Sequence, residues 1–246
     1  MRVAVAGGTG TVGRHVMSGL AAAGHTAISL SRSAGVDLTD PGSVTRALEG
    51  ADAVIDVAST QTMSAKRSAA FFGTTTRNLL DAEAAQGVGH HLALSIIGAA
   101  AAPANYYAGK KVQEELVAAS PRGWTILRAA QFHEFAPQTA AQASFAGFVG
   151  APKGQTQPIA AAEVGAELVR LAEAGPQGLA PDLAGPQEEW LPDMIRRYLA
   201  AAGKRARVIE VPLPGALGAA MRDGRLLPRP GAKLGTQTYA EWLAAL

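Results

Sequence analysis

The chain has 246 residues, enough to bury the core of one large domain or of a domain with an appended lobe. It has no cysteine, which excludes disulfides, thiolate metal sites and cysteine nucleophiles and is compatible with the cytoplasm, where we expect the protein. Its formal net charge is only +2, its basic residues are dispersed, and no stretch approaches the roughly 18 apolar residues of a membrane helix, so we expect neither a nucleic-acid nor a membrane partner.

Strand-like and helical segments alternate from the N-terminus onward. An apolar run over 2–6 leads through glycines to a helical pattern over 11–23, and 26–31 is typical of a second strand. A helix is predicted over 41–48, with Asp40 as its N-cap and Pro41 at its first position. Strands over 53–57, 91–96 and 124–128 then alternate with helices over 66–86 and 106–119. This alternation predicts a parallel sheet with helices on both faces and a ligand crevice beyond the carboxyl ends of its strands.

The alternation weakens after about residue 135. A short strand over 145–149, helices over 161–174 and 190–202, and a strand over 206–211 are predicted there. We interpret this part as a last strand and helix of the sheet, interleaved with a smaller lobe that closes over the crevice.

Three glycines stand between the first strand and the first helix. Gly7, Gly10 and Gly13 form G-x-x-G-x-x-G, which permits a tight turn, a close approach of the backbone to a pyrophosphate and close packing of helix on strand. The free N–H groups at the start of the helix favour an anion. The expected backbone donors are Gly8, Thr9, Thr11 and Val12. The turn therefore predicts a dinucleotide site.

The end of the second strand indicates which dinucleotide is bound. A carboxylate there would bind the ribose 2′-hydroxyl of NAD, whereas a basic residue accommodates the 2′-phosphate of NADP. The chain has Ser31, Arg32 and Ser33, and no acidic residue before Asp37. The planar donors of an arginine suit phosphate. We therefore predict NADP(H) rather than NAD(H), the alternative being that Arg32 is an ordinary surface residue.

The sequence resembles the atypical short-chain dehydrogenase/reductases, in their NmrA-like, NAD(P)H-binding branch. The resembling stretches follow in order through roughly the first 135 residues and are VAVAGGTGTVGRHV, SRS, VDLTDPGSV, AVIDVAS, GTTTRNLLDAE, LSIIG, YYAGKKVQEELV and WTILRAAQFHEF, with QPIAAAEVGAELVRLA later on. The resemblance implies an α/β, Rossmann-type doubly wound parallel sheet. We expect a dinucleotide-binding domain over 1–150, with the remaining elements and a small C-terminal substrate lobe over 151–246.

The resemblance also implies a role for several side chains. Asp37 and Leu38 would lie beside the adenine, and Ala58, Ser59 and Thr60 near the ribose and pyrophosphate. The nicotinamide would be bordered by Ala129, Ala130, Gln131 and Phe132. Leu38 and Ala58 could instead be packing residues.

A serine, a tyrosine and a lysine are the candidates for proton chemistry. Ser95 ends the fourth predicted strand, and Tyr106 and Lys110 share a helix face at spacing i, i+4. A nearby ammonium would lower the phenol's pKa and help it exchange a proton with a substrate oxygen, which the serine would orient. Tyr107 and Lys111 have the same spacing, but the resemblance of GKKVQEEL to the branch favours Lys110 and hence Tyr106. Some members of the branch have no working tyrosine, so these tyrosines could also be structural.

Three residues follow the fifth predicted strand. His133 and Glu134 could orient a substrate or cap the sheet edge, and Phe135 is a candidate for an apolar substrate pocket. His90 and His91 are adjacent on a strand and point to opposite faces, so we expect no metal site.

These residues favour an NADPH-dependent oxidoreductase acting on a small apolar carbonyl or quinone-type molecule. The alternatives are a non-catalytic NADP(H)-sensing regulator that binds a protein partner, and a nucleotide-sugar epimerase-like enzyme. The Tyr106–Lys110 pair with Ser95 favours catalysis over sensing, and the few polar anchors after residue 150 disfavour a sugar diphosphate. A homodimer in which the two long central helices pair across a two-fold axis is compatible with the pattern.

Overall fold

The computed structural model describes residues 1–246, which form two units. The first unit contains 1–128 and 162–180, and the second contains 129–161 and 181–246. The sequence predicted a boundary near residue 150 with interleaved elements after it, and the chain passes between the units at 128–129, 161–162 and 180–181.

The first unit is built on a parallel sheet. Its strands follow the order β2 (Thr26–Leu30), β1 (Arg2–Ala6), β3 (Ala53–Asp56), β4 (His90–Ile96) and β5 (Gly123–Ala129), with β9 (Gly178–Leu179) also paired to β5. β1 pairs in parallel with both β2 and β3, and β3 pairs in parallel with β4. Because the strand order reverses at β1, the sheet is doubly wound, as predicted.

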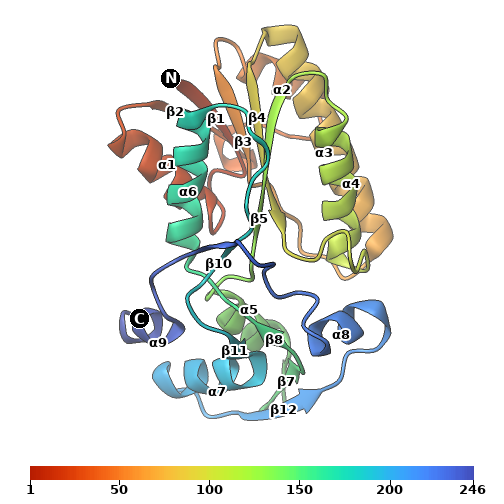
Figure 1. Ribbon diagram of the computed structural model, residues 1–246, viewed down its shortest axis with the longest axis vertical. Coiled ribbons are helices and arrows are strands. Elements are labelled where there is room, and N and C mark those ends of the chain that lie inside the picture. The colour runs from red at the N-terminus through yellow and green to blue at the C-terminus, as the bar shows by residue number, and fades with distance from the viewer. The chain divides into compact units, whose positions relative to one another are not determined.

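Helices cover both faces of this sheet (Figure 1). α1 (Gly13–Ala22) and α6 (Ala161–Ala174) lie on one face, and α3 (Ala65–Gln86) and α4 (Tyr106–Ala118) on the other. α3 and α4 pack closely because Gly109 has no side chain: a Cβ atom there would lie 2.3 Å from Ser68 Oγ. No helix combines the length and the apolar character that a membrane crossing requires.

The core of the first unit explains why its strands are short apolar runs. Val3 to Ala6 in β1 and Val54 and Ile55 in β3 have no more than a trace of exposed surface, as both faces of the sheet are covered. The short helix α2 (Pro41–Ala47) begins as predicted, because the Asp40 side chain accepts a hydrogen bond from the Gly42 N–H and Pro41 is its first residue. A 3₁₀ turn, η1 (Arg32–Ala34), follows β2 and was not predicted.

The second unit combines short strands with four helices. β6 (Ser144–Phe145), β7 (Phe148–Pro152) and β12 (Arg207–Val211) form a three-stranded sheet, β8 (Gln155–Thr156) pairs with β11 (Glu189–Trp190), and β10 (Leu183–Ala184) pairs with β13 (Lys233–Leu234). Its helices are α5 (Phe135–Gln142), α7 (Leu191–Ala201), α8 (Gly215–Arg222) and α9 (Tyr239–Ala244). The sequence predicted α7, β12 and the β6–β7 region but missed α5, α8 and α9, which are short.

Candidate dinucleotide and catalytic site

The glycine turn after β1 has the geometry that its sequence predicted. Gly7 has a φ of +82°, and a Cβ atom there would lie 2.9 Å from the carbonyl oxygen of Val57, just after β3. A Cβ atom at Gly13 would lie 2.1 Å from the Gly7 carbonyl oxygen, so only glycine lets α1 begin this close to the turn. The turn is thus packed against the carboxyl ends of both β1 and β3.

The backbone N–H groups of the turn divide into two sets. Gly8 donates to Val5 and Gly10 donates to Gly7, so Gly8 is not the free donor that the sequence suggested. The first i to i−4 bond of the helix is donated by Arg14 to Gly10. The N–H groups of Thr11, Val12 and Gly13 come before that bond and have no partner within the helix. They fit the phosphate-binding role of a dinucleotide turn.

A row of hydroxyls ends β2. Ser31 Oγ lies 3.1 Å from both Ser29 Oγ and Ser33 Oγ. Arg32, which follows Ser31, is the first residue of the 3₁₀ turn η1. Asp37 accepts hydrogen bonds from the Thr39 N–H and hydroxyl, both at 2.8 Å, and these bonds hold the pKa of Asp37 below its usual value. β2 is therefore followed by serine hydroxyls and the Arg32 guanidinium. The next carboxylate along the chain, that of Asp37, accepts its hydrogen bonds from Thr39.

Leu38 and Ala58 belong to the core of the first unit. Leu38 packs against the buried cluster that contains Ala58, and the Leu38 carbonyl accepts a hydrogen bond from Asn78. Ala58 is buried, and its N–H donates to Asp56 Oδ1 at 3.0 Å. These contacts support the packing role that the sequence left open for both residues.

The Tyr106 hydroxyl lies beside the segment that follows β3. It is 3.1 Å from Ser59 Oγ, and the Tyr106 ring packs edge-on against Phe72 with 5.5 Å between centroids. Burial raises the pKa of Tyr106 to about 12, although the hydrogen bond with Ser59 opposes this rise. The shift is opposite to the lowering that the sequence predicted. Asn105, just before Tyr106, has a φ of 52°, a strained conformation of the kind found at functional sites.

Lys110 is buried one helical turn after Tyr106 and bonds to other groups. Its Nζ donates to the Leu94 carbonyl at 2.7 Å and to Gln113 Oε1 at 2.9 Å, and it lies 4.3 Å from the centre of the Phe72 ring. Burial lowers the pKa of Lys110 to about 8, against the opposing effect of Asp56 and Glu114. The lysine therefore holds α4 to β4 and does not act on the Tyr106 hydroxyl here, which is why the predicted pKa shift is absent.

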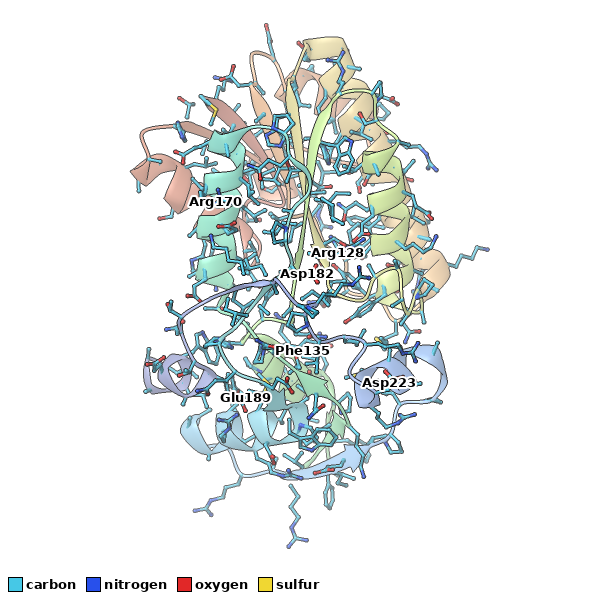
Figure 2. All side chains as sticks on the ribbon, viewed as in Figure 1. Arg128, Phe135, Arg170, Asp182, Glu189 and Asp223 are labelled. Carbon is cyan, nitrogen blue, oxygen red and sulfur yellow. The ribbon has the colours of Figure 1, made fainter.

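Ser95 belongs to a buried ion pair that the sequence analysis missed. Its hydroxyl donates to Glu114 Oε1 at 2.6 Å, and Arg128 binds the same carboxylate through Nε and Nη2 at 2.9 and 2.6 Å. Arg128 lies near the carboxyl end of β5 (Figure 2). Glu114 could have been noticed in the sequence because it stands one turn after Lys110 on the same helix face. The Ser95 proton is thus directed at a carboxylate.

The alternative pair, Tyr107 and Lys111, occupies different surroundings. Tyr107 is buried in the core, whereas Lys111 forms an exposed ion pair with Glu115. Tyr106 contacts Ser59 in the segment after β3.

The candidates after β5 lie in the second unit. Gln131 accepts a hydrogen bond from Thr156 at 2.6 Å, and Phe132 bridges to Ile159. His133 is completely buried, with its ring 5.4 Å from that of Tyr239 and its Nε2 3.2 Å from the Gln237 carbonyl oxygen. These contacts support the structural alternative for His133 rather than contact with a substrate. Phe135 is half-buried at the start of α5 (Figure 2).

The family model described as NAD(P)H-binding matches residues 34–175, more than half of the chain. The protein therefore belongs to this family of dinucleotide-binding proteins. This confirms the resemblance inferred from the sequence.

Several solved structures share the fold over nearly the whole chain. An NADPH-dependent quinone oxidoreductase (QOR2) from Escherichia coli is 20% identical, with 99% of this chain and 98% of that chain covered and a TM-score of 0.69. Its complex with NADPH is 22% identical, with 91% and 88% covered and a TM-score of 0.65. UDP-glucose 4-epimerase from Thermus thermophilus, in complex with NAD, is 20% identical, with 100% and 93% covered and a TM-score of 0.68. No curated protein matches the sequence.

Proposed function

We propose that this protein is an NADPH-dependent oxidoreductase that reduces a small apolar carbonyl or quinone-type acceptor. The observation that supports it best is the Tyr106 hydroxyl, which contacts Ser59 directly after the segment that packs on the Gly7 turn. The turn would hold the pyrophosphate, so Tyr106 would lie beside the path of the bound dinucleotide. Two of the similar structures are of an NADPH-dependent quinone oxidoreductase.

Tyr106 carries a proton that a reduction could use. A tyrosine phenol is protonated at neutral pH, and the burial that raises the pKa of Tyr106 to about 12 leaves it so. Bound NADPH would supply a hydride to the acceptor. Tyr106 would then give its proton to the acceptor oxygen as negative charge develops there.

We infer the preference for NADPH from the end of β2. Ser31, Arg32 and Ser33 offer hydroxyls and a guanidinium to a 2′-phosphate, and no carboxylate stands there to bind a free ribose 2′-hydroxyl. The expected cytoplasmic location and the homodimer stay predictions.

Titration of the purified protein with NADPH and NADH tests this preference. Arg32→Glu should weaken NADPH binding at least about tenfold, since one charge-assisted contact contributes about 1.5–3 kcal/mol, and should change NADH binding little. Arg122→Glu is the charge-matched control, because Arg122 precedes β5 and lies at the opposite ends of the strands. Equal losses for both cofactors in Arg32→Glu would contradict the 2′-phosphate assignment.

NADPH oxidation with a panel of quinones and ketones tests the reaction. A non-catalytic NADP(H) sensor is the second candidate, because Ser95 and Lys110 are both engaged by other groups. Tight NADPH binding with turnover supports the oxidoreductase. Tight binding without turnover on any acceptor supports the sensor.

A further inference from the structure

The hydroxyl in contact with the Tyr106 phenol is that of Ser59, whereas the predicted Ser95 is bound to another group. Ser59 Oγ lies 3.1 Å from the Tyr106 hydroxyl, and Ser59 is exposed. Ser95 is buried, and its proton is directed at Glu114, whose carboxylate is also held by Arg128. A hydroxyl in that position cannot donate to a second acceptor at the same time.

A buried network holds the segment that presents Ser59. Lys110 Nζ donates to Gln113 Oε1 at 2.9 Å, and Gln113 Nε2 donates to Asp56 Oδ2 at 2.7 Å. The other oxygen of Asp56 accepts the N–H of Ala58, the residue before Ser59. The polar groups of Asp56, Gln113 and Lys110 are buried, so they are costly to leave unpaired and therefore resist rearrangement.

Tyr106 is held from its other side by α3. Ser68 Oγ donates to the Tyr106 carbonyl at 2.8 Å, and the Phe72 ring packs edge-on against the phenol ring. The segment that presents Ser59 is thus tied to α4 through Asp56 and Gln113, and Tyr106 at the start of α4 is also held by α3. Such a pre-organised pair at the carboxyl ends of the strands is suited to moving a proton.

We propose that Ser59 is the positioning residue of the reaction, which orients the Tyr106 phenol and returns its proton from solvent. The inference rests on the proposed function. When bound, NADPH would supply the hydride to the acceptor carbonyl carbon. As negative charge develops on the acceptor oxygen, the O–H bond of Tyr106 would break and its proton would go to that oxygen. Ser59 gives its hydroxyl proton to the phenolate oxygen and takes a proton from water. The acceptor is reduced, NADPH is oxidised and one solvent proton is consumed.

The test compares Ser59→Ala, Ser59→Thr and Ser95→Ala with the exposed helix variant Ser18→Ala as control. With the acceptor that the wild-type protein reduces best, Ser59→Ala should lower kcat about tenfold or more, a loss larger than any loss in NADPH affinity. Ser59→Thr, which keeps a hydroxyl, should recover most of kcat. Ser18→Ala should match the wild type.

A second readout follows the Tyr106 hydroxyl without turnover. In protein labelled with ¹³C at the tyrosine Cζ, Tyr106→Phe identifies the Tyr106 signal among the four tyrosines. Ser59→Ala should shift that signal, because the hydrogen bond between the two hydroxyls is lost, and Ser59→Thr should return it. Ser95→Ala and Ser18→Ala should leave it in place.

The outcomes separate this inference from the proposed function. If the wild-type protein reduces no acceptor, the oxidoreductase and the proton path are both overturned. If the wild type turns over and Ser59→Ala keeps its kcat, or loses only NADPH affinity, the proton path alone is overturned. A loss of kcat in Ser95→Ala with none in Ser59→Ala would assign the hydroxyl to Ser95 and overturn it as well.

Discussion

Glu114 and Glu115 are adjacent on α4 and have opposite surroundings. The side chain of Glu114 is 9% exposed and that of its partner Arg128 is 17% exposed. Glu115 is 60% exposed and pairs with Lys111, which is 40% exposed. Coulomb attraction between exposed charges is weakened by water, whereas a buried charge that loses its partner keeps the full penalty of its burial. Adjacent positions of one helix therefore form a structural ion pair at Glu114 and a surface ion pair at Glu115.

This contrast predicts very different effects of two neighbouring substitutions. Glu114→Ala should lower the free energy of unfolding by about 3 kcal/mol or more, because it removes the buried carboxylate that accepts hydrogen bonds from Ser95 and Arg128. Glu115→Ala should lower it by less than about 0.5 kcal/mol. Urea unfolding of both variants measures this, and comparable losses would contradict it.

At the scale of an element, β4 begins with two histidines that contact different neighbours. His90 Nε2 lies 2.9 Å from Thr125 Oγ1 on β5, and His91 Nδ1 lies 2.6 Å from Glu83 on α3. Burial and the neighbouring His91 lower the pKa of His90 to about 4. Burial by itself would lower the pKa of His91, but the Glu83 carboxylate raises it above its ordinary value. The pKa values of these two adjacent residues are therefore shifted in opposite directions.

The two histidines predict opposite contributions to stability as pH changes. Below the ordinary histidine pKa of 6.5 and down to about 4, the unfolded chain binds a proton that folded His90 does not. His90 therefore makes the free energy of unfolding fall as the pH falls through this range. The contribution of His91 is fully present below pH 6.5 and is lost as the pH rises through its raised folded value.

Thermal unfolding between pH 4 and 9 would separate these effects. His90→Gln should flatten the acid side of the profile, because its amide can still form a hydrogen bond with Thr125 but does not titrate. His91→Gln should remove stability chiefly on the acid side of the folded His91 pKa and flatten the decline between pH 6.5 and that pKa. An acid side unchanged by His90→Gln would assign the acid sensitivity to other groups.

At the scale of the whole molecule, each unit joins segments far apart in the chain. The first unit includes residues 162–180, which contain most of α6 and follow the first segment of the second unit in the chain. The second unit includes all residues from 181 onward. Within the second unit, α9 returns to the segment after β5. The Tyr239 ring in α9 stacks on Trp242 and packs against His133, and the Arg197 guanidinium lies 4.9 Å from its centre. The Tyr239 hydroxyl donates a hydrogen bond to the Met194 carbonyl at 2.9 Å.

This arrangement predicts that Tyr239 is a main stabilising contact of the second unit. Tyr239→Phe should cost about 1 kcal/mol, because the Met194 carbonyl loses its donor. Tyr239→Ala should cost about 3–5 kcal/mol, because it leaves a cavity among His133, Arg197 and Trp242. Chemical unfolding and limited proteolysis of residues 236–246 measure both. A Tyr239→Ala protein as stable as the wild type would show that α9 does not hold this unit together.

The sequence by itself determined the parallel α/β architecture, the glycine turn, the Asp40 cap and most elements of the first unit. These features depend on local quantities: the period of apolar residues, the φ angles open to glycine and the hydrogen bonds of a helix end. Gly7 and Gly13 could be assigned for the same reason, because Gly7 has a positive φ and the close contacts of Gly13 are to Gly7 and Gly8 within the same turn.

Only the tertiary structure decided which polar groups meet in the candidate site. Ser59 and Tyr106 are 47 residues apart, Asp56 and Gln113 are 57 apart, and His133 and the Gln237 carbonyl are 104 apart. Helical spacing placed Lys110 on the same face as Tyr106, but the buried Leu94 carbonyl and Gln113 offered its ammonium better partners. A buried charge forms hydrogen bonds with the acceptors that the packing of strands and helices brings close to it. The periodicity of a sequence contains no information on the distances between groups in different elements.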